Sequence, residues 1–339
     1  MKAIVYHGKK NLSVEEVDIP AIGPDEVLIR VKYCGICGTD IHIYNGDGGS
    51  YDVEAPRILG HEFSGFVESV GPLVTSVKVG DLVSVDPNAM CGECYFCKAG
   101  KAHFCTKALA YGVTANGGFA EYAAARESAV YKYKDGVDPL AAAATEPLSC
   151  CLHGIDLCGV KAGDEVVVIG GGPIGMTMLQ LAKSSGVSKA ILIEPVASKR
   201  ALAKKLGADI ALDPTQTDIA AYLGEHCNNV DLVIECVGNP AIIEDAISWA
   251  GMGATVMMFG LTGPDAKIAV KPDDIFKKEL KLTSSFINPY AFGRAVALIE
   301  SGNINVASLV GAIVGLDEAI EAFEDSSLRS GGKVLVRVY

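Results

Sequence analysis

The stretch VVVIGGGPIG, residues 166–175, decides how the second half of this chain folds. A run of β-branched residues indicates a buried strand, and Gly170, Gly172 and Gly175 follow it in the spacing G-x-G-x-x-G. Pro173 stands where a helix begins, because its missing N–H would be unpaired there anyway. The residues beyond, PIGMTMLQLAKSSG and KAILIEP, favour a helix and then another strand. This order predicts a dinucleotide-binding βαβ unit.

The expected ligand of this turn is a dinucleotide, because glycines let the backbone approach a pyrophosphate and the helix N-terminus supplies free N–H groups. Glu194 ends the next strand 19 residues after Gly175, where a carboxylate binds the adenosine ribose and repels a 2′-phosphate. NAD is therefore favoured over NADP, although the nearby Lys199 and Arg200 leave NADP open. The expected cofactor-binding residues are Gly170, Gly172, Pro173, Ile174, Gly175, Glu194, Lys199, Val237 and Phe286.

Strands and helices alternate from about residue 159, which predicts a doubly wound parallel sheet. Before that point short strands and Gly/Pro turns recur, as in a β-rich domain. The chain ends on KVLVRVY, a strand with no helix after it, so we expect this strand to return to the first domain. The expected division is a β-rich domain over 1–155, a Rossmann domain over 156–286 and a C-terminal return over 287–339.

Composition narrows the class of protein. The net charge of −12 argues against binding to nucleic acid or to anionic membranes. Residues 166–182 are apolar, but their Gly-Gly-Gly-Pro interruption and Gln180 make them a poor membrane span. MKAIVYHGKK lacks the apolar segment of a signal peptide, so a cytoplasmic protein is expected. Its 11 cysteines then indicate metal binding or catalysis before disulfides.

Four of these cysteines lie within CGECYFCKAGKAHFC, in the spacing C-x2-C-x2-C-x7-C. Four thiolates this close can surround one tetrahedral ion, and zinc is the favoured occupant over an iron–sulfur cluster or disulfides. A site with four protein thiolates leaves no open place for a substrate. Cys91, Cys94, Cys97 and Cys105 are therefore expected to bind a structural zinc ion.

A reactive zinc would need about three protein ligands and an open position, where it lowers the pKa of a substrate hydroxyl. The candidates are Cys37 in CGICGTD, His61 and Glu62 in GHE, and Glu146 in ATEPLS. Each of them taken singly is more readily read as an ordinary buried or capping residue. Their combination is what carries the hypothesis.

CGICGTDIH, GHEFSG, the four-cysteine loop, EPLSCCLHG and GGGPIG occur here in the order found in zinc-dependent medium-chain dehydrogenases. The chain resembles that family over nearly its whole length. EPLS is similar to the polyol, or sorbitol dehydrogenase-like, branch, and CGICGTDIHIYNGD is equally similar to threonine dehydrogenases.

The resemblance implies an α/β fold, with a split GroES-like catalytic domain that is interrupted by a Rossmann domain. It implies that Cys37, His61, Glu62 and Glu146 surround the catalytic zinc, with either Glu62 or Glu146 as the third direct ligand. It also implies that Thr39 takes the proton of the substrate hydroxyl and passes it on to His42 and solvent, and that Asp40 orients His61.

The expected activity is oxidation of a secondary alcohol of a polyol or sugar alcohol to a ketone, with two zinc ions per chain and NAD. Phe286 is followed by Ile287, where sorbitol-type enzymes carry an arginine, and Ile43 stands where they carry a tyrosine. A phosphorylated polyol or an amino alcohol such as L-threonine therefore remains open as substrate. The alternative to an enzyme is a non-catalytic nucleotide-binding protein of the same fold. By the same resemblance we expect a homo-oligomer, a tetramer or a dimer.

Overall fold

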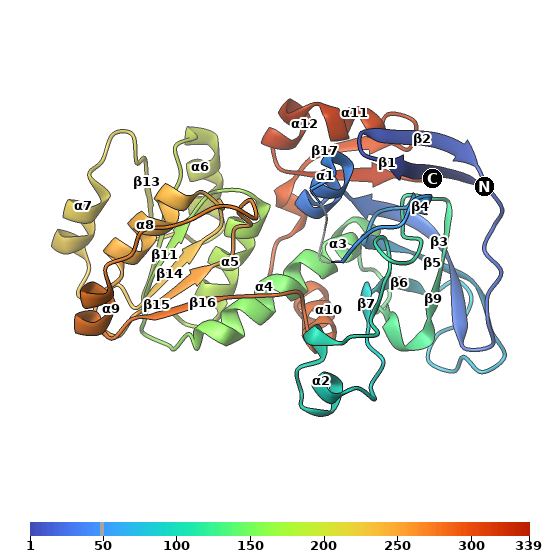
Figure 1. The fold of residues 1–339 in the computed structure, drawn as a ribbon, viewed down its shortest axis with the longest axis horizontal. Helices are drawn as coiled ribbons and strands as arrows, with labels where there is room; N and C mark the ends of the chain where they lie inside the picture. The colour runs from blue at the N-terminus through green and yellow to red at the C-terminus, as the bar shows by residue number, and fades with distance from the viewer. Residues whose placement is uncertain (48–50) are drawn as a thin grey trace. The chain divides into compact units, whose positions relative to one another are not determined.

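Two units share the chain in the computed structural model, which describes residues 1–47 and 51–339. The first unit comprises Met1–Ser149, Asn288–Gly302 and Val306–Tyr339, and the second comprises Cys150–Ile287 and Asn303–Asn305. The second unit is therefore inserted into the first. Figure 1 shows both ends of the chain in the first unit.

The first division falls six residues before the expected boundary at 155, inside helix α4 (Thr145–Cys158). The C-terminal half of α4 packs on the inserted unit, as Gly154 shows. A Cβ built on Gly154 would lie 2.9 Å from the Met178 side chain and 3.0 Å from that of Phe259. Packing of the helix, rather than the change of sequence pattern, sets this boundary.

A parallel sheet forms the centre of the inserted unit, in the order β13-β12-β11-β14-β15-β16. Val166, Val167 and Val168 have no exposed surface, as expected of a strand covered on both faces. Because the strands are parallel, their carboxyl ends meet at one edge of the sheet. The strands are β11 (Glu165–Ile169), β12 (Lys189–Ile193), β13 (Ile210–Leu212), β14 (Leu232–Glu235), β15 (Thr255–Met258) and β16 (Lys281–Ser284).

Helices connect these strands. Helix α5 begins at Pro173, with Gly172 as its N-cap. Helix α8 begins similarly at Pro240, after Asn239, whose side chain accepts a hydrogen bond from the Ala241 N–H. The helices are α5 (Pro173–Ser184), α6 (Ala197–Lys205), α7 (Ile219–His226), α8 (Pro240–Trp249) and α9 (Pro272–Lys278). The short α7 and α9 were not anticipated, because two turns give little periodic signal.

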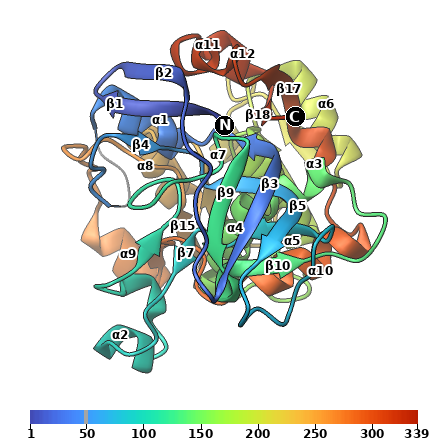
Figure 2. The same cartoon turned by 90° about the vertical axis from the view of Figure 1, so that its right-hand side faces the viewer.

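The first unit is built mainly on antiparallel strands. Its larger sheet has the order β10-β6-β5-β3-β18-β17, with β9 also paired to β3, and the smaller sheets are β2-β1-β4 and β7-β8. Figure 2 shows β3, β5 and β9 side by side. The strands are β1 (Lys2–Gly8), β2 (Asn11–Glu16), β3 (Glu26–Gly35), β4 (Arg57–Ile58), β5 (Glu62–Val70), β6 (Leu82–Val85), β7 (Asn88–Ala89), β8 (Leu109–Ala110), β9 (Tyr122–Arg126), β10 (Val130–Lys132), β17 (Val310–Gly315) and β18 (Lys333–Arg337).

The last strand, β18, returns to this sheet. It pairs antiparallel with β3, with Leu335 opposite Gly35, and parallel with β17. The helices of the unit are α1 (Gly38–Asn45), α2 (Tyr95–Lys98), α3 (Pro139–Ala143), α10 (Phe292–Ser301), α11 (Ala319–Glu324) and α12 (Ser326–Ser330), together with the start of α4. Among the described residues, no helix has the length and apolar character needed to cross a membrane.

Candidate active site

Three potential metal ligands meet where strands β3 and β5 lie side by side. Cys37 follows the end of β3, and His61 and Glu62 stand at the start of β5. One ligand atom from each residue lies within 4.8 Å of the other two. The register that places Gly35 opposite Glu62 brings these distant segments together. Thiolate, imidazole and carboxylate are ligands that zinc prefers, so this donor set fits a zinc ion.

Asp40 is a buried carboxylate that contacts two members of this group. Its Oδ2 accepts a hydrogen bond of 2.8 Å from the Cys37 N–H, and its Oδ1 lies 3.3 Å from Nδ1 of His61. Asp40 has no exposed surface. A carboxylate at Nδ1 fixes the ring and leaves Nε2 for a metal. Asp40 thus has the position expected of a residue that orients His61.

The electrostatics of the group favour positive charge. Burial lowers the pKa of His61, but the Asp40 carboxylate and the Cys37 thiolate raise it more strongly, so the pKa of His61 lies well above its ordinary value. The field that stabilises a proton on this ring also stabilises a bound cation.

Lys333, the first residue of β18, belongs to the same site. Its ammonium donates a hydrogen bond to Oε1 of Glu62 and forms an ion pair with the other carboxylate oxygen. The side chains of Lys333 and Glu62 are 15% and 0% exposed. Burial lowers the pKa of Lys333, but Glu62 and the Cys37 thiolate raise it above its ordinary value. Nothing in the sequence pattern indicates this contact, because a lysine at the start of a terminal strand is usually exposed.

Glu146 lies near this group but is not one of its three members. It is the second residue of α4 and is 8% exposed. Its carboxylate is not among the atoms that cluster within 4.8 Å, although its charge contributes to the raised pKa of Lys333. Direct contact between Glu146 and a metal ion stays a prediction.

Thr39 and His42 lie on α1, which begins directly after Cys37. Thr39 is half-buried, whereas the His42 side chain is 43% exposed and its Nδ1 lies 3.8 Å from Oδ2 of Asp47. Residues three apart on a helix are neighbours. Transfer of a proton from the Thr39 hydroxyl to His42 stays a prediction.

The four-cysteine loop forms a second group of potential ligands. The sulfurs of Cys91, Cys94, Cys97 and Cys105 all lie within 4.8 Å of one another, and no disulfide joins them. The backbone N–H of Cys97 lowers the pKa of Cys94 to about 6, which favours a thiolate. Figure 2 shows α2, which this loop carries, projecting from the sheet of its unit. Four converging thiols fit a closed zinc site.

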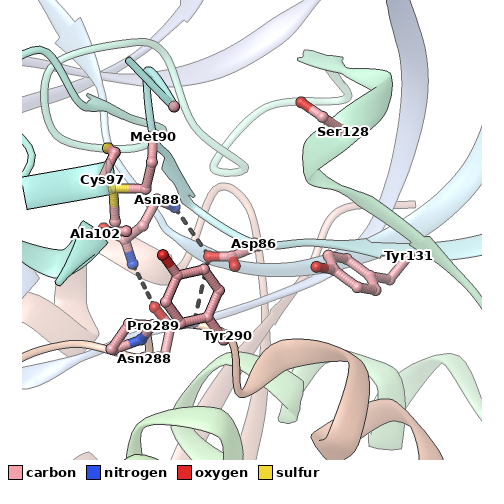
Figure 3. A pocket seen from close by; sticks show the side chains of 11 residues that line it. Asp86, Asn88, Met90, Cys97, Ala102, Ser128, Tyr131, Asn288, Pro289 and Tyr290 are labelled. Atoms are coloured by element: carbon pink, nitrogen blue, oxygen red, sulfur yellow. Dashed lines mark hydrogen bonds between the residues drawn. The ribbon is translucent and has the colours of Figure 1, made fainter. Parts of the chain in front are cut away.

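A pocket of about 250 Å³ lies beside this loop, and the side chain of Asp86 is part of its lining. Figure 3 shows Asp86, Asn88 and Asn288 joined by hydrogen bonds. Asn288 also donates a 2.8 Å hydrogen bond to Oγ of Ser149 and is 1% exposed. Burial raises the pKa of Asp86 to about 6. Asn288 therefore anchors the chain where it re-enters the first unit, a role that the sequence did not indicate.

The glycine-rich turn of the second unit joins β11 to α5 as expected. Gly172 is the N-cap of α5 and Pro173 is its first residue. A Cβ on Gly175 would lie 1.8 Å from the carbonyl oxygen of Gly170, so only glycine permits this close approach of turn and helix. The free N–H groups at this helix start fit a pyrophosphate, and Ile174 belongs to the same first turn.

Glu194 lies at the carboxyl end of β12, against this turn. Its Oε2 accepts a 2.7 Å hydrogen bond from the Gly171 N–H, and its Oε1 accepts one of 2.8 Å from the Val196 N–H. Arg200 donates to the carbonyl oxygens of Glu194 and Pro195 and forms an ion pair of 3.1 Å with Asp213. Contact between Glu194 and a ribose stays a prediction, and Arg200 is engaged with Asp213 and with backbone carbonyl groups.

Val237 and Phe286 follow β14 and β16, at the same edge of the sheet. Their side chains are 48% and 38% exposed. Val237 is next to the turn, because a Cβ on Gly170 would lie 2.9 Å from its Cγ2. Lys199 is half-buried on α6. Contact of Val237, Phe286 and Lys199 with a cofactor stays a prediction.

Comparison with known proteins identifies the family of this chain. Two family descriptions match: "Alcohol dehydrogenase GroES-like domain" over residues 23–135 and "Zinc-binding dehydrogenase" over residues 173–301. D-arabinitol dehydrogenase 1 from Uromyces fabae is 36% identical over 99% of this chain and 97% of its own length. L-threonine 3-dehydrogenase from Caldanaerobacter subterraneus is 38% identical over 82% of this chain and 81% of its own length.

A solved structure shares the whole fold. The crystal structure of a zinc-binding dehydrogenase from Sinorhizobium meliloti, bound to NADP, matches with a TM-score of 0.95 and 37% identity over 99% of each chain. The α/β fold, a GroES-like domain with an inserted Rossmann-type sheet, is thereby confirmed. The chain belongs to the zinc-binding dehydrogenases of the alcohol dehydrogenase family, and it is an oxidoreductase of the alcohol and polyol dehydrogenase type.

Proposed function

We propose that this protein oxidises a secondary alcohol of a polyol or sugar alcohol to a ketone, with NAD as the hydride acceptor. The observation that carries the proposal is the convergence of Cys37, His61 and Glu62 in a chain of this family. The alternative of a non-catalytic nucleotide-binding relative is disfavoured, because no expected ligand of the reactive metal is missing from the sequence.

Each residue of the site has a distinct task in this proposal. Cys37 and His61 hold the catalytic zinc, with Glu62 or Glu146 as the further carboxylate. The zinc ion supplies a Lewis acid at the substrate hydroxyl. Thr39 accepts the proton of that hydroxyl, and His42, whose side chain is 43% exposed, delivers it to solvent.

The second zinc ion belongs to the four-cysteine loop and is structural. Among the described residues the four sulfurs form a group of their own, and four protein ligands leave no place for a substrate. Two zinc ions per chain are therefore expected.

NAD is the proposed cofactor because the Glu194 carboxylate lies against the glycine turn and repels a 2′-phosphate. Arg200, which could offset that repulsion, is bound to Asp213. The Sinorhizobium meliloti relative was solved with NADP, so the choice requires direct measurement.

The substrate class has two candidates. The relative named for D-arabinitol covers 99% of this chain and supports a polyol, free or phosphorylated, whereas the relatives named for L-threonine support an amino alcohol. A panel of pentitols, hexitols, their phosphates and L-threonine, with NAD and with NADP, separates them by the absorbance of the reduced cofactor. A homo-oligomer and a cytoplasmic location stay predictions.

Replacement of the proposed zinc thiolate tests the assignment directly. In Cys37→Ser we expect one zinc ion per chain to be lost and turnover to fall at least about 100-fold, while cofactor binding persists in the other unit. Cys34→Ala is the matched control, because Cys34 is buried and lies outside the ligand group. Metal analysis, steady-state kinetics and cofactor titration measure the outcome. Full activity in Cys37→Ser would refute the proposal.

A further inference from the structure

A buried ion pair lies inside the proposed catalytic metal site. Both oxygens of Glu62 contact the Lys333 ammonium, and the Glu62 side chain has no exposed surface. One oxygen of the same carboxylate is within 4.8 Å of the ligand atoms of Cys37 and His61. The same carboxylate is therefore within reach of both the ammonium and a metal ion held by Cys37 and His61.

The backbone is shaped to hold this pair. Gly35 lies on β3 between its partners on the neighbouring strands, Glu62 on one side and Leu335 on the other. A Cβ on Gly35 would lie 2.1 Å from Oε2 of Glu62 and 2.9 Å from Cε of Lys333. The absence of a side chain here gives Lys333 room to reach Glu62 across β3.

Lys333 is the cation that the structure places among the anionic groups of this site. Its ammonium interacts with Glu62, with the Cys37 thiolate and with Glu146. If this ammonium were removed, the buried Glu62 carboxylate would lose its ion-pair partner, which favours a bound metal ion in its place because an unpaired buried charge is strongly unfavourable.

We propose that Lys333 is a positioning residue that competes with the metal ion for Glu62. By holding the carboxylate outside the metal's ligands, Lys333 keeps one position open for substrate. This inference rests on the proposed function, because it assumes that Cys37 and His61 bind the catalytic zinc. Lys333 itself need not contact substrate.

The test compares how fast the wild-type holoenzyme and its variants lose metal to a chelator. The kinetic phase that is absent in Cys37→Ser reports this site. In Lys333→Met, Glu62 becomes a metal ligand, so we expect this phase to slow about 10-fold to 100-fold, the range seen when groups around metal ligands are changed. After cobalt substitution, the difference spectrum against Cys37→Ser should change as the ligand set changes.

Three variants serve as controls. Lys333→Arg keeps the charge and should resemble wild type. Lys132→Met removes the lysine of another ion pair in the same unit, with Asp81, and should leave this phase unchanged. In the double variant Lys333→Met/Glu62→Gln the released carboxylate is gone, so the wild-type rate and cobalt spectrum should return.

Gly35→Ala provides a second route to the same state if Lys333→Met folds poorly. The added methyl group separates Glu62 from Lys333, so metal loss should slow as well. Gly331→Ala, two residues before Lys333, is the matched control because its Cβ would have no atom within 4 Å.

Unchanged metal loss and an unchanged cobalt spectrum in Lys333→Met would overturn the inference. So would a double variant that behaves like Lys333→Met. If Cys37→Ser removes no metal phase at all, the proposed function itself fails. The two failures are thereby distinguished.

Discussion

Cys34 and Cys37 show how far the surroundings of a residue decide its chemistry. They stand three residues apart in one C-x-x-C, yet Cys34 is fully buried on β3 and its thiol pKa is raised well above the ordinary value by burial. Cys37 is the residue before α1 and lies against His61 and Glu62. The two cysteines are therefore neither a redox pair nor half of one metal site.

Asp86 is a second residue whose surroundings set its behaviour. Its pKa is about 6 in the folded protein against 3.8 for a free side chain. The folded state therefore holds the proton more tightly, so folding stability falls as the pH rises from about 4 to about 6. Above about pH 6 folding bears the full free-energy cost of ionising the buried Asp86 carboxyl group.

We expect Asp86→Asn to remove this cost. The variant should be more stable than wild type at pH 8, by up to about 3 kcal/mol, and should gain little at pH 4. An asparagine oxygen can still accept the hydrogen bonds from the Asn88 N–H and the Asn288 side chain. Urea unfolding at the two pH values measures the difference. An equal gain at both values would contradict the explanation.

At the scale of elements, the four-cysteine loop has little regular secondary structure and little apolar burial to stabilise it. Its helix α2 spans only Tyr95–Lys98, and Tyr95 and Phe104 remain 77% and 47% exposed. We therefore expect this loop, with so little apolar burial, to depend on a bound metal ion for order.

We expect Cys94→Ser to remove one zinc ion per chain and to lower the melting temperature. The Cys37 site should keep its own zinc ion, since the two ligand groups share no residue. Cys227→Ser, a half-buried cysteine of the other unit, should change neither property. Metal analysis and thermal unfolding test this. Loss of both zinc ions in Cys94→Ser would show that the sites are coupled.

At the scale of the whole molecule, the chain leaves the first unit at α4 and comes back to complete it. The final strand β18 lies between β3 and β17, and it brings Lys333 to ligands that are some 270 residues earlier in the sequence. The first unit therefore cannot be complete before the end of the chain is in place.

The contribution of this last strand can be measured with one buried and one exposed residue of β18. Leu335 is 1% exposed, whereas Arg337 is exposed. We expect Leu335→Ala to cost about 2–5 kcal/mol of unfolding free energy. Arg337→Ala should stay within about 0.5 kcal/mol of wild type. Similar losses in both variants, measured by urea unfolding, would show that side-chain burial is not what joins this strand to the core.

The sequence by itself determined the parts whose residues are neighbours along the chain. The G-x-G-x-x-G turn between Gly170 and Gly175 is local, because strand, turn and helix follow one another, and the four cysteines from Cys91 to Cys105 lie within one loop. Cys37, His61 and Glu62 were found by resemblance to a family, since no spacing joins Cys37 to His61.

Only the tertiary structure decided the contacts made across strands and between distant segments. Lys333 reaches Glu62 because β18 pairs with β3 and Gly35 leaves room between them, and Asn288 meets Asp86 and Ser149 where the chain re-enters its first unit. The boundary inside α4 likewise follows from packing on Met178 and Phe259. Burial and charge pairing at these places depend on the register of strands, which a linear pattern does not encode.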